Sequence, residues 1–288
     1  MLKLWKEEMQ KKWYQQGDSL LQEIREMLPE QEELLFWYLG QCGFVFKKEK
    51  IVYIDAVLND ITDEQGNSLR YYPIPFAPEK VKADYVLCTH AHDDHLAVET
   101  VMGIARSDSN TRFIVPGEGV EILKRAGMED ERIIEAFAGK TITLPGLTVF
   151  PIAAAHPEYR KTARGGETAL CYEMTMGNFR LLHMGDTYLT SQLLSDLQER
   201  ESPDLFFSPV NGMDYFRTAR NCIGNLNTIE TAQLAVMLKA DMTIPNHYDM
   251  IKGNTVDPLD FVRQLRALDS AAKWHLPALG ECVTYRKH

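Results

Sequence analysis

The stretch Cys88–Leu96, CTHAHDDHL, holds three of the eight histidines of the 288-residue chain, together with two aspartates. It begins within residues 85–89, whose apolar run predicts a strand, and it leads into a predicted helix at about 97–105. In α/β sheets, ligands bind where the chain leaves the carboxyl end of a strand. Because imidazole and carboxylate groups bind divalent metals, the stretch predicts a metal site rather than an exposed polar turn.

Single candidate ligands stand after three further predicted strands. Any one of them alone would be weak evidence, since isolated polar residues at strand ends are common. Their recurrence at separate strand ends is what a metal site built on a sheet edge requires. The candidate ligands are His90, His92, Asp94, His95, His156, Asp186 and His247. Asp93 is expected to face solvent or to orient a ligand, and His183 to pack in its strand or to contact a ligand.

The pattern along the chain is that of a mixed α/β protein with a substantial sheet core. Predicted strands lie at 34–39, 43–46, 51–55, 85–89, 112–115, 147–152, 168–175, 179–184, 205–208, 242–245 and 282–285, and predicted helices at about 97–105, 117–126, 191–200, 228–240 and 257–268. No repeat or Pro/Ser-rich linker divides the chain, so we expect one domain over residues 1–288. The polar, Pro-rich segment 59–80 should be a long loop, and loops of that length are often functional.

Residues 1–30 are expected to form an N-terminal helical segment that packs on the body. Apolar residues at helical spacing run from Leu2 to Trp13, and Ser19 with Gln22 has the spacing of a capping box, which predicts a second helix to about Leu28. Glu and Lys mix on the polar face, so packing on the body or on another subunit is favoured over membrane binding.

Composition excludes several classes of function. A net charge of −10 provides no basic field for nucleic acid or an anionic membrane. The five cysteines are widely spaced without a C-x-x-C pair, which is typical of reduced thiols in the core. No signal peptide is visible, and no run approaches the roughly 18 apolar residues of a membrane span. We therefore expect a cytoplasmic protein.

The order of the candidate ligands resembles that of the metallo-β-lactamase superfamily, from about Leu34 to the C-terminus. The resemblance implies an αββα sandwich of two facing mixed sheets with outer helices, and a site at one edge of the sheets. It also implies one or two divalent ions, manganese or zinc, and allows a homo-oligomer. His90, His92 and His156 match the ligands of a first metal, Asp94, His95 and His247 those of a second, and Asp186 the bridging carboxylate.

The flanking segments LLFWYLGQCGFVFK and IPNHYDM are similar to the L-ascorbate-6-phosphate lactonase group of that superfamily. Two metal ions can lower the pKa of a shared water to about 7, and the resulting hydroxide could open a small phosphorylated lactone or ester. Asp94 and His247 are the candidate catalytic residues, and Asp94 would orient the nucleophile. The candidate residues for binding a sugar-phosphate-like substrate are Arg160, Arg164, Asn211, Arg217, Arg220 and Asn221.

Two other functions remain open at this point. The same dinuclear site could hydrolyse a phosphodiester, or the chain could be a non-catalytic metal-binding sensor or scaffold. The acidic charge balance counts against a nucleic-acid substrate. The complete ligand set counts against a non-catalytic role.

Overall fold

Two seven-stranded sheets form the centre of the computed structural model, which describes residues 13–287. The first sheet has the strand order β14 (Cys282–Arg286), β1 (Glu33–Gly40), β2 (Gly43–Lys47), β3 (Ile51–Ile54), β4 (Tyr85–Leu87), β5 (Arg112–Val115) and β6 (Ile133–Glu135). The second has the order β13 (Lys273–Trp274), β12 (Met242–Asn246), β11 (Leu205–Pro209), β10 (Phe179–His183), β9 (Leu170–Met176), β8 (Leu147–Ala153) and β7 (Ile142–Leu144).

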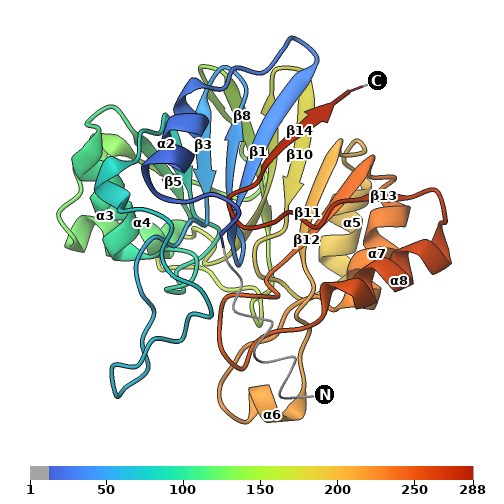
Figure 1. Ribbon diagram of the computed structural model, residues 1–288. Helices are drawn as coiled ribbons and strands as arrows, with labels where there is room; N and C mark the ends of the chain where they lie inside the picture. Colours follow the sequence, from blue (N-terminus) through green and yellow to red (C-terminus); the bar gives the residue numbers. More distant parts are fainter. Residues whose placement is uncertain (1–12, 288) are drawn as a thin grey trace.

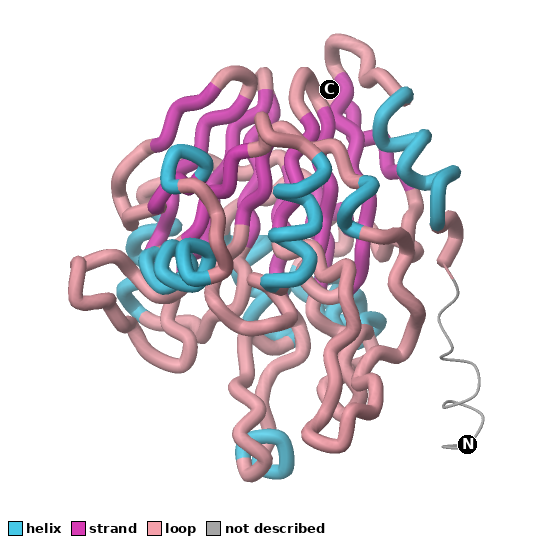
Figure 2. Tube along the Cα trace, turned by 90° about the vertical axis from the view of Figure 1, so that its left-hand side faces the viewer, coloured by secondary structure: helices cyan, strands magenta, loops and turns pink. Residues whose placement is uncertain are grey.

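Except for one short helix, the described helices cover the outer faces of the two sheets. They are α2 (Gly17–Glu26), α3 (Val98–Ser107), α4 (Gly117–Arg125), α5 (Ser191–Gln198), α6 (Tyr215–Thr218), α7 (Thr228–Met237) and α8 (Pro258–Leu268). The exception is the short α6, which lies among the loops below the strands (Figure 1). Helices α3 and α4 lie outside the first sheet, and α5, α7 and α8 lie outside the second (Figure 1). Strands fill the upper part of the molecule and long loops gather below them (Figure 2). The predicted αββα sandwich of mixed sheets is therefore confirmed.

Aromatic side chains fill the space between the sheets. Phe207 of β11 lies among Phe36, Phe44 and Phe46 of the opposite sheet, with ring centroids 5.5, 4.7 and 5.0 Å away. All four side chains are fully buried. Burying a ring of this size stabilises a fold by about 1.5–3 kcal/mol. These contacts fix the distance between the two sheets.

Strand direction brings the polar strand ends to one edge of the sandwich. β3 and β4 are parallel in the first sheet, and β10, β11 and β12 are parallel in the second. β8 is antiparallel to β9, which is antiparallel to β10, so β8 points the same way as β10. The residues that follow these strands therefore meet at the carboxyl ends. They include Asp55, Thr89, His156, Asp186 and His247.

The N-terminal prediction is only partly testable. The predicted helical face from Leu2 to Trp13 lies outside the described residues except for Trp13, which is buried. The second predicted helix is α2, but the predicted capping box is wrong. Gln16 occupies the N-cap position, and Ser19 lies inside the first turn, where its hydroxyl donates to the Gln16 carbonyl. Four short elements, β6, β7, β13 and α6, were not predicted, because two to four residues show no periodicity.

The predicted long loop at 59–80 is present, and it ends in a 3-10 turn at Pro78–Lys80. Its anchor is Arg70, whose buried guanidinium donates to the carbonyls of Val57, Asn59 and Tyr72. These bonds hold the loop below the strand ends. No helix within residues 13–287 is long and apolar enough to cross a membrane.

Candidate metal centre

Three imidazole rings converge beyond the ends of β4 and β8. His90 Nε2 lies 2.9 Å from His92 Nδ1, and His156 Nε2 lies 3.2 Å from the same atom. The Thr89 hydroxyl donates its only hydrogen to Asp55 Oδ2 at 2.7 Å, so toward His90 Nδ1, 3.1 Å away, it can only accept. His90 therefore carries its proton on Nδ1 and presents the lone pair of Nε2 to the group, as a metal ligand must.

Asp186 lies between this first group and a second group. Its Oδ2 atom is 3.7 Å from His156 Nε2 and 3.1 Å from His247 Nε2, while its Oδ1 atom is 3.3 Å from His95 Nε2. Asp94 Oδ2 lies 3.5 Å from His247 Nε2 and 3.8 Å from His95 Nε2. The seven predicted ligands thus form two adjacent groups, and Asp186 approaches both. Asp93 is exposed at the cavity described below.

Asp55 supports both groups from behind. It is fully buried and accepts hydrogen bonds from the Thr89 N–H at 2.8 Å, from the Thr89 hydroxyl and from His95 Nδ1 at 2.7 Å. A carboxylate behind a histidine fixes the ring and its tautomer. His95 Nε2 consequently faces Asp186 and makes no hydrogen bond. Sequence reasoning did not single out Asp55, although an acid directly after the apolar run 51–54 was a readable signal.

The position of Asp186 depends on the close approach of the turn at Gly185 to Thr89. Gly185 has φ +55°, and a Cβ atom there would lie 2.6 Å from the Thr89 side chain, so the turn tolerates no larger residue. His183 accepts from the Gly185 N–H at Nδ1 and donates through Nε2 to the Cys42 carbonyl at 2.9 Å. Burial lowers the pKa of His183 and keeps the ring neutral, as this pairing requires. His183 is thus a positioning residue.

Sequence reasoning also missed the role in the site of the turn between β1 and β2, residues 40–43. Gln41 has φ +55°, a conformation that costs a non-glycine residue about 1–3 kcal/mol. Asp249 accepts the Gln41 N–H at 3.1 Å, and the Gln41 carbonyl accepts from the His247 N–H at 2.8 Å. The Gln41 amide donates to Asp94 Oδ2 at 2.7 Å. The same turn places Cys42 Sγ 3.7 Å from Asp186 Oδ1.

Electrostatics distinguish the two groups. Burial holds the pKa of His90 well below its ordinary value and lowers that of His156 to about 4, so these rings are neutral. In the second group burial also disfavours the charged ring, but Asp186 and neighbouring carboxylates outweigh it. They raise the pKa of His247 to about 9 and that of His95 well above its ordinary value. Because metal ligands must be deprotonated, a cation that binds the second group displaces these protons.

The nature of the donors fits divalent metal ions. Neutral imidazole nitrogens converge with carboxylate oxygens and a sulfur, which are the ligands that zinc takes in proteins. The buried His95 Nε2 atom, without a hydrogen-bond partner, faces the space between them. His90, His92 and His156 would hold one ion, and His95, Asp186 and His247 with Cys42 or Asp94 a second.

A cavity of about 280 Å³ opens onto both groups. Its walls combine apolar side chains with amides, a thiol and the metal-site residues. The lining residues are Ile61, His92, Asp93, Asp94, His156, Asp186, Asn221, Cys222, Ile223, His247, Ile251 and Asn254. Ile61 comes from the long loop, and the residues at 221–223 follow α6, so both segments help to shape the cavity.

Two of the predicted substrate-binding residues point to carboxylates elsewhere. Arg160 pairs with Glu158 at 2.8 Å, and Arg164 pairs with Glu121 at 2.9 Å and with Glu135. All of these pairs lie at the surface or are half-buried. Neither arginine is among the residues that line the cavity.

Three of the other four predicted substrate-binding residues lie at the cavity or next to its lining. Asn221 lines it directly. Arg217 Nη1 donates to Asn254 Oδ1 at 2.8 Å, and the buried Asn211 donates to the same atom at 3.2 Å. Arg220 is exposed, and its Nε atom donates to a main-chain carbonyl of α6. Arg217 and Asn211 are therefore one contact away from the lining.

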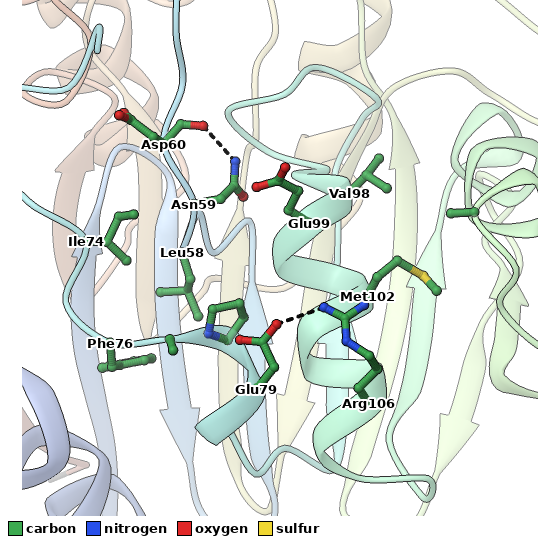
Figure 3. A pocket seen from close by; sticks show the side chains of 13 residues that line it. Leu58, Asn59, Asp60, Ile74, Phe76, Glu79, Val98, Glu99, Met102 and Arg106 are labelled. Carbon is green, nitrogen blue, oxygen red and sulfur yellow. Dashed lines mark hydrogen bonds and ion pairs between the residues drawn. The ribbon is translucent and has the colours of Figure 1, made fainter. Parts of the chain in front are cut away.

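A larger cavity of about 830 Å³ lies beside α3 (Figure 3). Leu58 and Met102 give it an apolar lining, and Glu79 pairs with Arg106 across it at 2.8 Å. Its described lining contains no histidine or cysteine. The convergent donors that chemistry requires are at the smaller cavity.

Comparison with known proteins agrees with this geometry. A family model described as the beta-lactamase superfamily domain matches residues 50–248, more than half of the chain. The chain is 29% identical over 238 residues to a UPF0173 metal-dependent hydrolase of Archaeoglobus fulgidus, covering 80% of this chain and 90% of the relative. A second relative with that description, from Methanoculleus marisnigri, is 29% identical over 183 residues and covers 61% of this chain and 71% of its own length.

Solved structures show the same fold. Igni18, a metallo hydrolase from Ignicoccus hospitalis, superposes with a TM-score of 0.67 at 20% identity, covering 89% of this chain and all of that one. An isothiocyanate hydrolase from Delia radicum gut bacteria also gives 0.67, at 15% identity, covering 88% and 100%. The finer likeness to the L-ascorbate-6-phosphate lactonase group stays a prediction. With its two facing sheets and matching domain, the chain belongs to the beta-lactamase superfamily and has the metallo-β-lactamase fold.

Proposed function

We propose that this chain is a metal-dependent hydrolase that opens a small ester or lactone. The observation that carries the proposal is the convergence of two donor groups at one cavity, with Asp186 between them. Relatives described as metal-dependent hydrolases support it. A site with this many buried donors would be costly to keep for structure alone, since buried polar groups destabilise a fold unless they are satisfied.

The seven predicted ligands hold the metal ions in this proposal. When bound, divalent ions lower the pKa of a coordinated water toward 7 and polarise a carbonyl. Asp94 is turned toward the cavity by the Gln41 amide, so its carboxylate can orient a water. The main-chain N–H of His247 donates to the Gln41 carbonyl, which fixes the position of this residue. One turn therefore positions both candidate catalytic residues.

The lining of the cavity suits a small acyl group. Three isoleucines, Ile61, Ile223 and Ile251, can contact its carbon atoms, while Asn221 and Asn254 can bind hydroxyl or carbonyl oxygens. A phosphorylated substrate would need a cation as well. Arg217 also pairs with a carboxylate, that of Asp214, but it is the best placed of the predicted arginines because its Nη1 atom contacts Asn254. A phosphorylated lactone is therefore our specific candidate within the ester and lactone class.

The test is a substrate screen on protein freed of metal and reloaded with zinc or manganese. Lactones, esters and a bis-nitrophenyl phosphodiester should be compared for metal-dependent turnover. His92→Ala and Asp186→Ala should abolish activity, and Arg164→Ala, which changes a surface ion pair, is the matched control. Full activity of either ligand variant would contradict the proposed site.

Other outcomes of the same screen separate the competing functions. Hydrolysis of the phosphodiester with every lactone and ester untouched would replace the proposal by a phosphodiesterase. Tight binding of a panel compound without product would instead indicate a sensor or scaffold. Either result would leave the metal centre intact but refute ester hydrolysis.

A further inference from the structure

A thiol from the β1–β2 turn stands within the second donor group. Cys42 Sγ and one ligand atom each of His95, Asp186 and His247 all lie within 4.8 Å of one another. Cys42 is fully buried and the segment around it is tightly packed, since a Cβ atom on Gly40 would lie 1.8 Å from the hydroxyl oxygen of a buried tyrosine. The turn therefore holds the sulfur in one place.

Two separations within this group are close to those of a tetrahedral zinc site. With bond lengths of about 2.0 Å to nitrogen or oxygen and about 2.3 Å to sulfur, such a site separates two N/O donors by about 3.3 Å and sulfur from oxygen by about 3.5 Å. The observed separations are 3.3 Å between His95 Nε2 and Asp186 Oδ1, and 3.7 Å between Cys42 Sγ and Asp186 Oδ1. His247 Nε2 lies 3.1 Å from Asp186 Oδ2. The sulfur thus occupies a ligand position relative to its neighbours.

Two buried groups without partners point to the same conclusion. His95 Nε2 is buried, makes no hydrogen bond and faces Asp186 Oδ1 at 3.3 Å. Asn246 Oδ1 lies 3.4 Å from Cys42 Sγ, while Asn246 Nδ2 has no partner although it is buried. The oxygen and nitrogen of the Asn246 side-chain amide exchange places when the amide turns by about 180°, and the two orientations are hard to tell apart. A thiolate at Cys42 would accept from Nδ2 in that orientation, which gives the amide nitrogen a partner.

We propose that Cys42 is a thiolate ligand of the metal ion held by His95, Asp186 and His247, and that its sulfur makes this position selective for zinc over manganese. The inference rests on the proposed function for the existence of the metal centre, but it assigns a residue that the superfamily resemblance does not. Thiolate is a soft ligand that suits zinc, whereas manganese prefers oxygen. When the ion binds, the Cys42 sulfhydryl proton passes to solvent.

The first measurement needs no variant. X-ray absorption of the zinc-loaded full chain should show a zinc–sulfur shell at about 2.3 Å. Its amplitude should correspond to one sulfur per two zinc ions, because only the second group contains a cysteine. A fit with nitrogen and oxygen alone, at two zinc ions per chain, would overturn the proposal.

Cobalt substitution then identifies the sulfur. A thiolate ligand gives a charge-transfer band in the near-ultraviolet, which should appear with the second equivalent of cobalt in the wild-type chain. Cys42→Ser should lose this band while still binding the first equivalent. Cys222→Ser is the matched control, because Cys222 is a half-buried thiol that lines the same cavity, and it should keep the band.

Metal selectivity supplies a third readout. Loss of an outer partner of a ligand commonly weakens metal binding about 10–100-fold, so loss of the ligand itself in Cys42→Ser should weaken zinc binding at the second position by at least about 100-fold. Manganese affinity there should change much less. If zinc and manganese affinities fall equally, the sulfur does not set selectivity and the proposal fails.

The outcomes separate this inference from the proposed function. A chain that binds two metal ions and hydrolyses its substrate without any sulfur signal retains the function and loses the thiolate ligand. Loss of the cobalt band in Cys222→Ser, with Cys42→Ser unchanged, would reassign the ligand and refute the inference. A wild-type chain that binds no metal would refute both. Circular dichroism on each variant confirms that the fold is kept, and the absorption measurement on the wild type decides the case should Cys42→Ser not fold.

Discussion

Replacing Asp55 by asparagine should weaken metal binding at both donor groups, although Asp55 is not a ligand. The carboxylate accepts from His95 Nδ1 and from the Thr89 hydroxyl, both at 2.7 Å. In Asp55→Asn an NH₂ group would face these donors. The neutral His95 ring, the form that binds metal, would then carry its proton on Nε2, the nitrogen that faces Asp186. The Thr89 hydroxyl would accept from the new amide and donate to His90 Nδ1, which moves the proton of His90 to Nε2 as well.

The size of the effect follows from the bonds involved. Outer partners of metal ligands commonly contribute about 10–100-fold to metal affinity. That range corresponds to about 1.4–2.7 kcal/mol for each ion. The lost charge-assisted hydrogen bond to His95 is worth about 1.5–3 kcal/mol, which agrees with this range. Both positions should therefore lose at least tenfold in affinity, because the change reaches His90 through Thr89.

The assay is competition between metal-free protein and a chromophoric zinc chelator, which reports both binding steps. Asp93→Asn is the matched control, since Asp93 is an exposed aspartate two residues from His95 and should bind metal as the wild type does. A urea midpoint for each variant shows whether the fold survives. If Asp55→Asn bound both ions with affinities within threefold of the wild type, the tautomer argument for His90 and His95 would be wrong.

Three further predictions follow from other contacts. Burial opposes protonation of His247, but Asp186 outweighs burial and raises the pKa of the ring from 6.5 to about 9. In metal-free protein, kept so by a chelator, the His247–Asp186 pair therefore stabilises the fold fully below pH 6.5, and this contribution is lost as the pH rises through about 9. Urea midpoints should decrease between about pH 7 and about pH 9.5, and a flat profile would contradict the pairing. Arg217→Ala should raise KM for a phosphorylated substrate at least about tenfold and leave KM for its dephosphorylated analogue unchanged, whereas equal changes in both would show that Arg217 binds no phosphate. Asn227→Ala removes the capping-box bonds at the start of α7 and should lower the free energy of unfolding by about 0.5–2 kcal/mol without altering metal binding, as measured by urea denaturation.

The parts of the site that could be predicted are those encoded by neighbours in the chain. His90, His92, Asp94 and His95 lie within six residues, so local geometry alone brings them together. His156, Asp186 and His247 required the additional rule that parallel strands end at one edge of a sheet. The rule succeeded because β8, β10 and β12 all point the same way.

The residues that were missed depend on contacts between distant parts of the chain. Gln41 takes its left-handed conformation because it bonds with Asp249 and His247, more than 200 positions away, and no local pattern announces this. Cys42 is buried, as expected for a core thiol, but its neighbours are a carboxylate and an amide. Arg160 and Arg164 failed to converge on the cavity for the same reason, since their ion pairs with Glu158 and Glu121 are invisible in the sequence.

Each donor group takes its residues from both sheets, and this has a mechanical consequence. The second group joins the β1–β2 turn and His95 of the first sheet to Asp186 and His247 of the second. An ion bound there would act as a cross-link between chain segments far apart in sequence, comparable with a disulfide across a long loop. Phe207 sets the sheet spacing and stacks on His183, which bonds to the carbonyl of Cys42. Interior packing and metal affinity are therefore coupled, and a change in the aromatic core would alter the separation of the metal donors without touching a ligand.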